Sequence, residues 1–264
     1  MKWLVHIGYN GSNYSGWQFQ PNVASVQGVI EEKLKAIFKI DISVVGCGRT
    51  DAGVHASQYM LHFTLEESFD FNLKFRLNKH LPNEIVVYDV IALEKEQHCR
   101  FDAVSRTYDY FIHLYKDPFL SQCSSFYELE DLNFDAMKKA AAMLPEFDDF
   151  KSVCRQPDLY KHTLCKVSQA RFFVDAQEKR LRFTITANRF LRGMVRIIVD
   201  YLLQIGSGSM SLEEFKKMLS NEVEIPEKHP ALPNGLYLSH VEYTYLNVES
   251  QPDIGSFLKL GLED

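Results

Sequence analysis

The sequence predicts an α+β fold in two lobes of similar size, each built on antiparallel strands. A chain of 264 residues is long enough for about two domains. Segments with strand periodicity often follow one another directly, which favours antiparallel pairing over units in which a helix separates parallel strands. Each half also contains about two segments with helical periodicity. We expect residues 1–103 to form the N-terminal half and residues 104–264 to form the C-terminal half.

The first half opens with a strand and a helix. Residues 2–8 are mostly apolar and lead into a turn-forming cluster at residues 10–13, which is typical of a strand and its end. Between Val26 and Phe38 apolar residues recur at helical spacing, and Ser25 has the side chain of an N-cap. The other elements expected here are a short strand at 42–45, a strand at 57–65, a helix at 71–80 and a strand at 84–93.

The second half repeats this mixture of strands and helices. Apolar periodicity predicts a helix at 134–144, which Pro145 ends, and two consecutive helices at 189–205 and 211–219. The strands expected in this half lie at 106–115, 167–174, 181–187 and 236–244.

The composition is that of a globular protein in a reducing compartment. Apolar residues make up 46% and charged residues 24% of the chain. No run of about 18 apolar residues predicts a membrane span, and the first residues become polar too soon for a signal peptide. The cysteine count is five, with no C-x-x-C pair, which argues against a secreted disulfide framework and against a zinc ribbon. We therefore expect a cytoplasmic protein.

Positive charge is concentrated in one segment of an acidic chain. The formal net charge is −6, which by itself argues against a nucleic-acid partner. Between Arg155 and Arg196, however, ten lysines and arginines stand against three acids, a net charge of +7, so the other residues together carry −13. Arg189, Arg192 and Arg196 are spaced to share one face of the predicted helix. Two interpretations stay open: a solvated basic helix face, or a surface that binds phosphate groups.

A glycine-rich turn between two predicted strands carries the strongest candidate for catalysis. Residues 46–56 read G-C-G-R-T-D-A-G-V-H-A, and their spacing fits neither a P-loop nor a dinucleotide fingerprint. Either Arg49 and Asp51 form a local ion pair that caps the loop, or a guanidinium keeps Asp51 ionised as a carboxylate nucleophile. Because no second acid lies near in the sequence, this nucleophile suits a leaving group that departs as a stable anion, such as a uracil ring that leaves C1′.

Cys47, His55 and His62 are weaker candidates. Cys47 lies between two glycines with no base nearby, so we interpret it as a packing residue rather than a nucleophile. His55 and His62 lack the cysteine or carboxylate neighbours of a metal site, and we expect neither to be a metal ligand.

Seven motifs, the turn at 46–56 among them, lie in one order along nearly the whole chain. The six others are Y-N-G-S-N-Y-S-G-W-Q-F-Q at 9–20, S-V-Q-G at 25–28, L-N-K-H-L-P-N-E-I at 77–85, R-T-Y-D-Y at 106–110, N-R-F-L-R-G-M-V-R at 188–196 and P-N-G-L-Y-L at 233–238. Together they resemble the TruA-type tRNA pseudouridine synthase family, whose signature is G-x-G-R-T-D-A-G-V-H-A.

The resemblance implies a fold, a partner and a reaction. The implied fold has two ferredoxin-like, or RRM-like, halves whose sheets join into one antiparallel surface with the active-site cleft between them. A homodimer that binds tRNA and needs neither a metal nor an organic cofactor is implied as well. The implied reaction converts uridine to pseudouridine at positions 38, 39 and 40 in the anticodon stem-loop of tRNA.

The resemblance also assigns roles to single residues. Asp51 corresponds to the catalytic aspartate, which attacks the target nucleoside at C6 of the ring or at C1′ of the sugar. Arg49 corresponds to the arginine that helps to take the target out of its stack. Tyr108 corresponds to the tyrosine that stacks on the target and helps to remove the C5 proton, and Arg196 to the arginine that pairs with the catalytic aspartate. Leu238 corresponds to a residue that packs against the target base.

Neighbouring residues leave alternatives open. Leu236 could take the place of the leucine that packs on the base, and Tyr110, on the same strand face as the stacking tyrosine, is expected to be a core aromatic. Arg189 and Arg192 are expected to bind the substrate, and Arg192 adds a positive charge that the family helix usually lacks. Asp200 replaces a glycine of the family and could pair with the arginine four residues before it, in competition with the catalytic aspartate.

Two other functions compete with this one. A non-catalytic RNA-binding module would use the same fold and basic segment, but it would not need the aspartate, the two arginines and the tyrosine together. A nucleoside hydrolase or glycosylase would also use Asp51 as its nucleophile, but it would need a general acid that the sequence does not place nearby.

Overall fold

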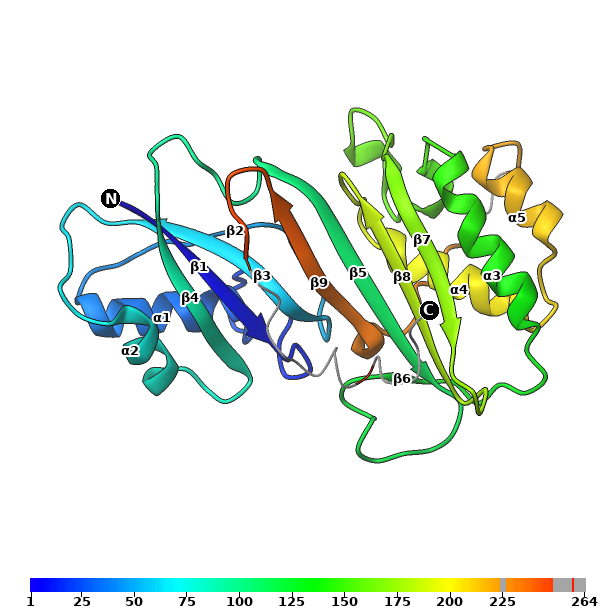
Figure 1. The fold of residues 1–264 in the computed structure, drawn as a ribbon, viewed down its shortest axis with the longest axis horizontal. Coiled ribbons are helices and arrows are strands. Elements are labelled where there is room, and N and C mark those ends of the chain that lie inside the picture. The colour runs from blue at the N-terminus through cyan, green and yellow to red at the C-terminus, as the bar shows by residue number, and fades with distance from the viewer. Residues whose placement is uncertain (224–226, 249–257, 259–264) are drawn as a thin grey trace. The chain divides into compact units, whose positions relative to one another are not determined.

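The computed structural model describes residues 1–223, 227–248 and 258, and it divides the chain into two compact units (Figure 1). Unit 1 contains Met1–Val104 and residues 237–248, and unit 2 contains Ser105–Leu236. The described residues form nine strands, paired mostly in antiparallel fashion, and five α-helices. The α+β class that the sequence predicts is therefore confirmed.

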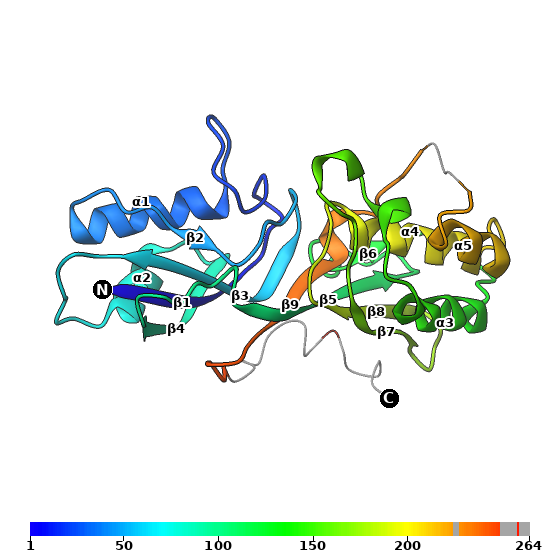
Figure 2. The same ribbon diagram turned by 90° about the horizontal axis from the view of Figure 1, so that it is seen from above.

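Unit 1 combines a sheet with two helices. Its elements are β1 (Lys2–Tyr9), α1 (Val26–Phe38), β2 (Val45–Gly46), β3 (His55–Thr64), α2 (Leu73–His80), β4 (Ile85–Leu93) and β9 (Leu236–Tyr243). The strand order is β4-β1-β3-β9, with β2 also paired to β3. β3 and β4 are antiparallel to β1, whereas β9 runs parallel to β3. The two helices pack against each other, and Figure 2 shows α1 lying along the sheet.

Unit 2 has the same kinds of element. They are β5 (Ala103–His113), β6 (Ser125–Phe126), α3 (Phe134–Met143), β7 (Val167–Val174), β8 (Arg180–Ala187), α4 (Met194–Gly206) and α5 (Leu212–Leu219). β8 lies between β5 and β7 and is antiparallel to both. The short β6, which the sequence did not predict, pairs in parallel with β5. Helix α3 packs against β7 and against α4 (Figure 1).

Side-chain caps explain why two of the helices begin where the sequence predicts. Ser25 Oγ accepts the N–H of Gly28 at 3.2 Å and so satisfies a backbone donor at the start of α1. At α5, Ser211 Oγ accepts the N–H of Glu214 at 3.2 Å, and Glu214 Oε2 accepts the N–H of Ser211 at 2.8 Å. This reciprocal pair is a capping box.

The predicted start of the helix at 189 is wrong. Helix α4 begins at Met194, after Gly193 with φ 74° in the left-handed region. The backbone groups of Arg192 bond to residues outside the helix. Its carbonyl accepts the N–H of Arg155 at 3.0 Å, and its N–H donates to Tyr160 Oη at 3.0 Å. Arg189 and Arg192 therefore lie in the turn before α4 and do not share a helix face with Arg196.

Of the strand expected at 42–45, only Val45 lies in a strand, the two-residue β2. The backbone of Val44 is bonded to side chains of α1 instead: its N–H donates to Glu31 Oε1 at 2.9 Å, and its carbonyl accepts from Gln27 Nε2 at 3.3 Å. Because these bonds replace pairing with a neighbouring strand, the ladder with β3 begins only at Val45.

The basic segment between Arg155 and Arg196 is partly neutralised by acids. Arg182 forms a buried ion pair with Asp109 of β5, with Nε and Oδ1 3.3 Å apart, and its guanidinium lies 4.2 Å from the centre of the Phe173 ring. This arginine therefore contributes little to the surface potential. The charge of +7 counted along the sequence is not the charge of one surface.

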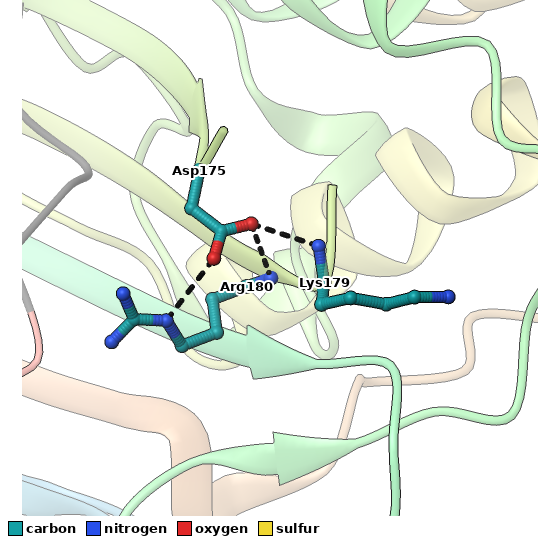
Figure 3. Close-up of polar contacts among 3 residues, drawn as sticks. All are labelled: Asp175, Lys179 and Arg180. Atoms are coloured by element: carbon teal, nitrogen blue, oxygen red, sulfur yellow. Dashed lines mark hydrogen bonds and ion pairs between the residues drawn. The ribbon is translucent and has the colours of Figure 1, made fainter. Parts of the chain in front are cut away.

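Asp175 closes the turn between β7 and β8. Its Oδ1 accepts the N–H groups of Lys179 at 2.8 Å and of Arg180 at 2.9 Å, and its Oδ2 accepts from Arg180 Nε at 3.2 Å (Figure 3). Burial raises the pKa of the Asp175 carboxyl, but these hydrogen bonds and the Arg180 charge lower it by more, so the pKa lies below its ordinary value.

We expect Asp175→Asn to lower the free energy of unfolding at pH 7 by about 1 kcal/mol, because the charge that strengthens these bonds is lost. A lowered folded-state pKa stabilises the protein above the unfolded pKa, and that stabilisation is lost as the pH falls through the folded pKa. The difference in free energy of unfolding between the wild type and Asp175→Asn should therefore be constant from pH 8 to pH 5 and should become smaller below pH 4. Urea unfolding across this range measures it, with the exposed Glu178→Gln as a control that changes stability by less than about 0.5 kcal/mol. A gap that widens on acidification would contradict the assignment.

Candidate active site

The loop that carries Asp51 joins β2 to β3 in unit 1. Asp51 is half-buried in it, and Arg49 is exposed. No ion pair joins the two residues in the part of the chain that the structure describes. The interpretation of this turn as a local ion pair between Arg49 and Asp51 is therefore not supported.

Two glycines let the backbone of residues 10–20 come into direct contact with the Asp51 loop. A Cβ on Gly11 would lie 1.9 Å from the carbonyl oxygen of Val54, and a Cβ on Gly16 would lie 2.4 Å from the carbonyl oxygen of Thr50. Gly16 also has φ 92°, which side chains disfavour. Both positions therefore exclude any larger residue while the loop keeps its place.

Hydrogen bonds hold the Asp51 loop on both sides of the carboxylate. On one side, the Thr50 carbonyl accepts the N–H of Trp17 at 3.2 Å, and Thr50 Oγ1 lies 2.8 Å from Tyr9 Oη. On the other side, the N–H of Gly53 donates to the carbonyl of Tyr14 at 3.2 Å. The backbone at Asp51 is thus fixed between two anchored neighbours, which preorganises its side chain.

Aromatic packing supports the start of the loop. The rings of Trp17 and Tyr59 stack with centroids 4.2 Å apart, and Tyr59 Oη donates to the carbonyl of Gly48 at 2.5 Å. A Cβ on Gly46 would lie 2.1 Å from that hydroxyl oxygen. Cys47 is fully buried, and its Sγ accepts the N–H of Met60 at 3.4 Å, which fits the packing role predicted for it.

His55 ties the end of the loop to β9. Its Nδ1 accepts the N–H of Gly11 at 3.0 Å, and its ring stacks on Tyr237 with centroids 4.5 Å apart. In the next register pair Ala56 lies opposite Leu238, so the leucine predicted to pack on the target base is next to the strand that follows the Asp51 loop. Leu238 is 1% exposed and Leu236 is 7% exposed.

In unit 2 the predicted tyrosine lies on β5. Tyr108 is 9% exposed, and its ring meets the edge of the Phe190 ring with centroids 4.9 Å apart. Tyr110, two residues on, is fully buried as the sequence predicts, yet its hydroxyl also bonds the carbonyl of Leu232 at 2.7 Å.

Arg196 lies in the first turn of α4 and is bonded in both directions to Ala231. Its Nε donates to the Ala231 carbonyl at 2.6 Å, and its own carbonyl accepts the N–H of Ala231 at 3.0 Å. The carboxylate of Asp200 instead accepts from Gln204 Nε2 at 2.7 Å, and no ion pair with Arg196 forms within the described ranges. Burial raises the pKa of the Asp200 carboxyl. The ion pair between Asp200 and Arg196, which the sequence analysis left open, is therefore not formed.

The turn with Arg189 and Arg192 is packed against a loop at 155–160. Arg192 Nη1 donates to Gln156 Oε1 at 2.5 Å, and the Arg189 guanidinium carbon lies 5.7 Å from the centre of the Tyr160 ring. The two arginines are held in one surface region by these contacts, even though they do not belong to the helix.

Comparison with known proteins identifies the family. The sequence model described as tRNA pseudouridine synthase matches residues 140–244. Over 245 residues the chain is 39% identical to tRNA pseudouridine synthase A of Porphyromonas gingivalis. The matched region covers 92% of this chain and 97% of that protein. The chain belongs to the tRNA pseudouridine synthase A family. Proteins of the same name from Bacteroides thetaiotaomicron and Staphylococcus aureus are 38% and 31% identical, over 92% and 98% of this chain and 90% and 97% of theirs.

The predicted site residues of this chain are divided between the units. Arg49, Asp51 and Leu238 lie in unit 1, and Tyr108, Arg189, Arg192 and Arg196 lie in unit 2. The sequence did not predict the supporting roles of His55, Tyr110 and the segment 10–20. The spacing of glycines and aromatic residues in the first motif is the signal that could have indicated a backbone-to-backbone contact.

One cluster in unit 1 has residue types that bind metals in other proteins. Ligand atoms of His62, His98 and Cys99 all lie within 4.8 Å of one another. His62 Nδ1 is 3.1 Å from Cys99 Sγ, and His98 Nδ1 accepts backbone N–H groups from Arg100 and Phe101 at 3.1 and 3.3 Å. The contact between His62 and Cys99 connects residues 98–101 to β3, and the His98 bonds lie within that segment. All five cysteines lie in described residues, and none forms a disulfide.

None of the helices within the described ranges has the length and apolar character of a membrane span.

Replacing Gly11 by alanine should displace the Asp51 loop, because the added Cβ has no room next to the Val54 carbonyl. We expect Gly11→Ala to lower the free energy of unfolding by about 3 kcal/mol. Gly48→Ala is the matched control in the loop itself, since a Cβ there meets no atom within 4 Å, and it should change stability by less than about 0.5 kcal/mol. Chemical unfolding of the two variants measures the difference. Equal stabilities would show that the close approach at Gly11 does not hold the loop.

Proposed function

We propose that this protein converts uridine to pseudouridine in tRNA, with Asp51 as the nucleophile and positions 38, 39 and 40 of the anticodon stem-loop as the targets. The observation that supports the reaction most strongly is a half-buried aspartate on a loop held by backbone contacts on both sides. Such rigidity suits a nucleophile that must meet one atom of its substrate. Membership of the tRNA pseudouridine synthase A family supports tRNA as the substrate.

In the proposed reaction the carboxylate of Asp51 attacks the target nucleoside at C6 of the base or at C1′ of the ribose. The N1–C1′ bond then breaks, the uracil ring turns, and C5 forms a bond to C1′. The bond to Asp51 breaks as well, by displacement when C5 attacks C1′ or by elimination from C6, and the free carboxylate is restored. The proton on C5 is removed, and N1 gains a proton, so the product is an isomer of the substrate. Because uracil leaves as a stabilised anion, the step needs no general acid beside the nucleophile.

Four further residues complete this proposal. Arg196 keeps Asp51 ionised, since a nearby guanidinium favours the charged form of a carboxylate. Tyr108 stacks on the target base and helps to remove the C5 proton. Arg49 is exposed, and it helps to take the target out of its stack, which a base in a stem requires. Leu238 packs against the flipped base.

The turn before α4 is proposed to bind the RNA backbone. Arg189 and Arg192 are held together by the loop at 155–160, and planar guanidinium groups donate paired hydrogen bonds to phosphate. In the homodimer that we propose from the family, this region occurs twice, and both copies contact one folded tRNA. The reaction as proposed uses no metal and no organic cofactor, and the protein is proposed to act in the cytoplasm.

Release of tritium from tRNA labelled at C5 of uridine tests the reaction, because the C5–H bond is lost when C5 bonds to C1′. The wild type should release label without free uracil. Asp51→Asn should lower the rate by at least about 10³-fold, since the amide is no nucleophile, and should keep the dissociation constant for tRNA within about threefold. Asp70→Asn, at an exposed aspartate of the same unit, is the matched control and should keep full activity.

Other outcomes of this assay favour the competing functions. Free uracil among the products would indicate a glycosylase. Binding of tRNA with neither label nor base released would indicate a non-catalytic RNA-binding module. Full activity of Asp51→Asn would overturn the assignment of the nucleophile.

The phosphate-binding role of Arg192 has a test of its own. Arg192→Ala should weaken tRNA binding and reduce the slope of log affinity against log salt by about 0.7–0.9, the value for one phosphate contact. Arg192→Lys keeps the charge and should keep the slope. Titrations of tRNA at several salt concentrations measure both variants, and an alanine variant with the wild-type slope would place this side chain away from phosphate.

A further inference from the structure

Two tyrosines, the fully buried Tyr110 and the half-buried Tyr127, close a ring of hydrogen bonds around the backbone of Leu232. The N–H of Leu232 donates to Tyr127 Oη at 2.9 Å, and Tyr110 Oη donates to the Leu232 carbonyl at 2.7 Å. The two hydroxyl oxygens are 3.1 Å apart. Because the amide can only donate and the carbonyl can only accept, Tyr127 must donate to Tyr110 for the ring to close. Both backbone polar groups of one residue, Leu232, are thus fixed by two side chains.

The residue before Leu232 holds Arg196. Ala231 accepts from Arg196 Nε at 2.6 Å and donates its N–H to the Arg196 carbonyl at 3.0 Å. Pro230 and Pro233 flank these two residues, and proline fixes φ, so the segment is stiff. A displacement of Leu232 is therefore passed to Ala231 and to the guanidinium bonded to it.

The bond to Ala231 determines how the Arg196 guanidinium is oriented. It engages Nε, one of the five N–H donors of a planar group. Fixing Nε sets the plane of the guanidinium and directs the two terminal nitrogens, which are the ones suited to paired contact with a carboxylate. Burial raises the pKa of both Tyr110 and Tyr127, so both phenols keep the protons that the ring of bonds requires.

We propose that Tyr127 is a positioning residue for Arg196, acting through Leu232 and Ala231. The inference rests on the proposed function, in which Arg196 keeps Asp51 ionised. Tyr127 touches no reacting atom in this scheme. Its hydroxyl keeps the Pro230–Pro233 segment in the place from which Ala231 orients the guanidinium, with Tyr110 as the second member of the pair.

Tyr127→Phe tests this, since it removes the hydroxyl and keeps the ring. Single-turnover release of tritium from labelled tRNA should slow about tenfold at saturating enzyme, because a misplaced catalytic group costs rate. The dissociation constant for tRNA should stay within about twofold. Tyr201→Phe is the matched control on α4: among the described residues its buried hydroxyl has no hydrogen-bond partner, so its removal should leave the rate unchanged. Tyr110→Phe, which frees the Leu232 carbonyl, should act like Tyr127→Phe.

A double-variant cycle separates positioning from general destabilisation. In the Arg196→Lys background, where the bond from Nε is absent, Tyr127→Phe should cause no further loss of rate. An equal tenfold loss in both backgrounds would overturn the route through Arg196, and so would a Tyr127→Phe rate within twofold of wild type. If the Arg196→Lys rate falls below detection, the Tyr127→Phe single variant decides. A slower rate with an unchanged dissociation constant for tRNA supports the positioning role, and an unchanged rate overturns it. A loss of rate that matches the loss of folded protein in thermal unfolding also overturns the proposal.

The same assay separates this inference from the proposed function. A wild-type protein that releases no tritium contradicts the function itself. An active wild type whose tyrosine variants keep full rate contradicts only the positioning role.

Discussion

The contact of two backbone segments at Gly11 and Gly16 is the constraint on which the rest of unit 1 depends. Without side chains at these positions, residues 10–20 reach the carbonyl groups of Thr50 and Val54 directly. The hydrogen bonds of Trp17, Tyr14 and Tyr9 are possible only at that separation. The close approach is therefore what converts a flexible glycine-rich turn into a rigid support for Asp51.

In unit 2 the position of Arg196 is fixed in a different way. Arg196 has the rigidity of α4 on one side and a proline-flanked segment on the other, and the two are joined through Ala231. The segment has little regular structure of its own, so the hydroxyls of Tyr110 and Tyr127 supply the partners that a strand or helix would otherwise provide. In unit 1 hydrogen bonds fix the backbone on both sides of Asp51, whereas in unit 2 Arg196 is held through its carbonyl and through Nε of its guanidinium.

The elements with strong local signals could be predicted from the sequence. Ser25 caps its helix as expected, because a cap depends on residues within one turn. The start of α4 was missed because apolar periodicity carries no information about the left-handed backbone at Gly193. Val44 was taken for a strand residue because the competing bonds come from side chains of α1.

The candidate site shows the same division. The motif around Asp51 was predicted to lie in a turn between two strands, as it does, and the existence of β3 and β5, though not their ends, was predicted as well. The net charge of the surface formed by the basic segment could not be predicted from the sequence. A count along the segment does not include Asp109, which lies far from Arg182 in sequence and pairs with it. Nor could spacing alone reveal that His55 accepts a bond from Gly11 across 44 positions.

The pairing of β9 with β3 has a consequence for how the protein is made. Tyr237 stacks on His55, and the N–H of Val241 donates to the buried Gln58 Oε1 across 183 positions. On the ribosome, unit 2 is synthesised before the strand that completes unit 1. The start of β3, at His55 and Ala56, therefore lacks its strand partner until residues 236–243 have emerged, and contacts of such long range form slowly. Chain elongation thus sets the earliest time at which the loop acquires its full support, and a fragment that stops at Val104 lacks it.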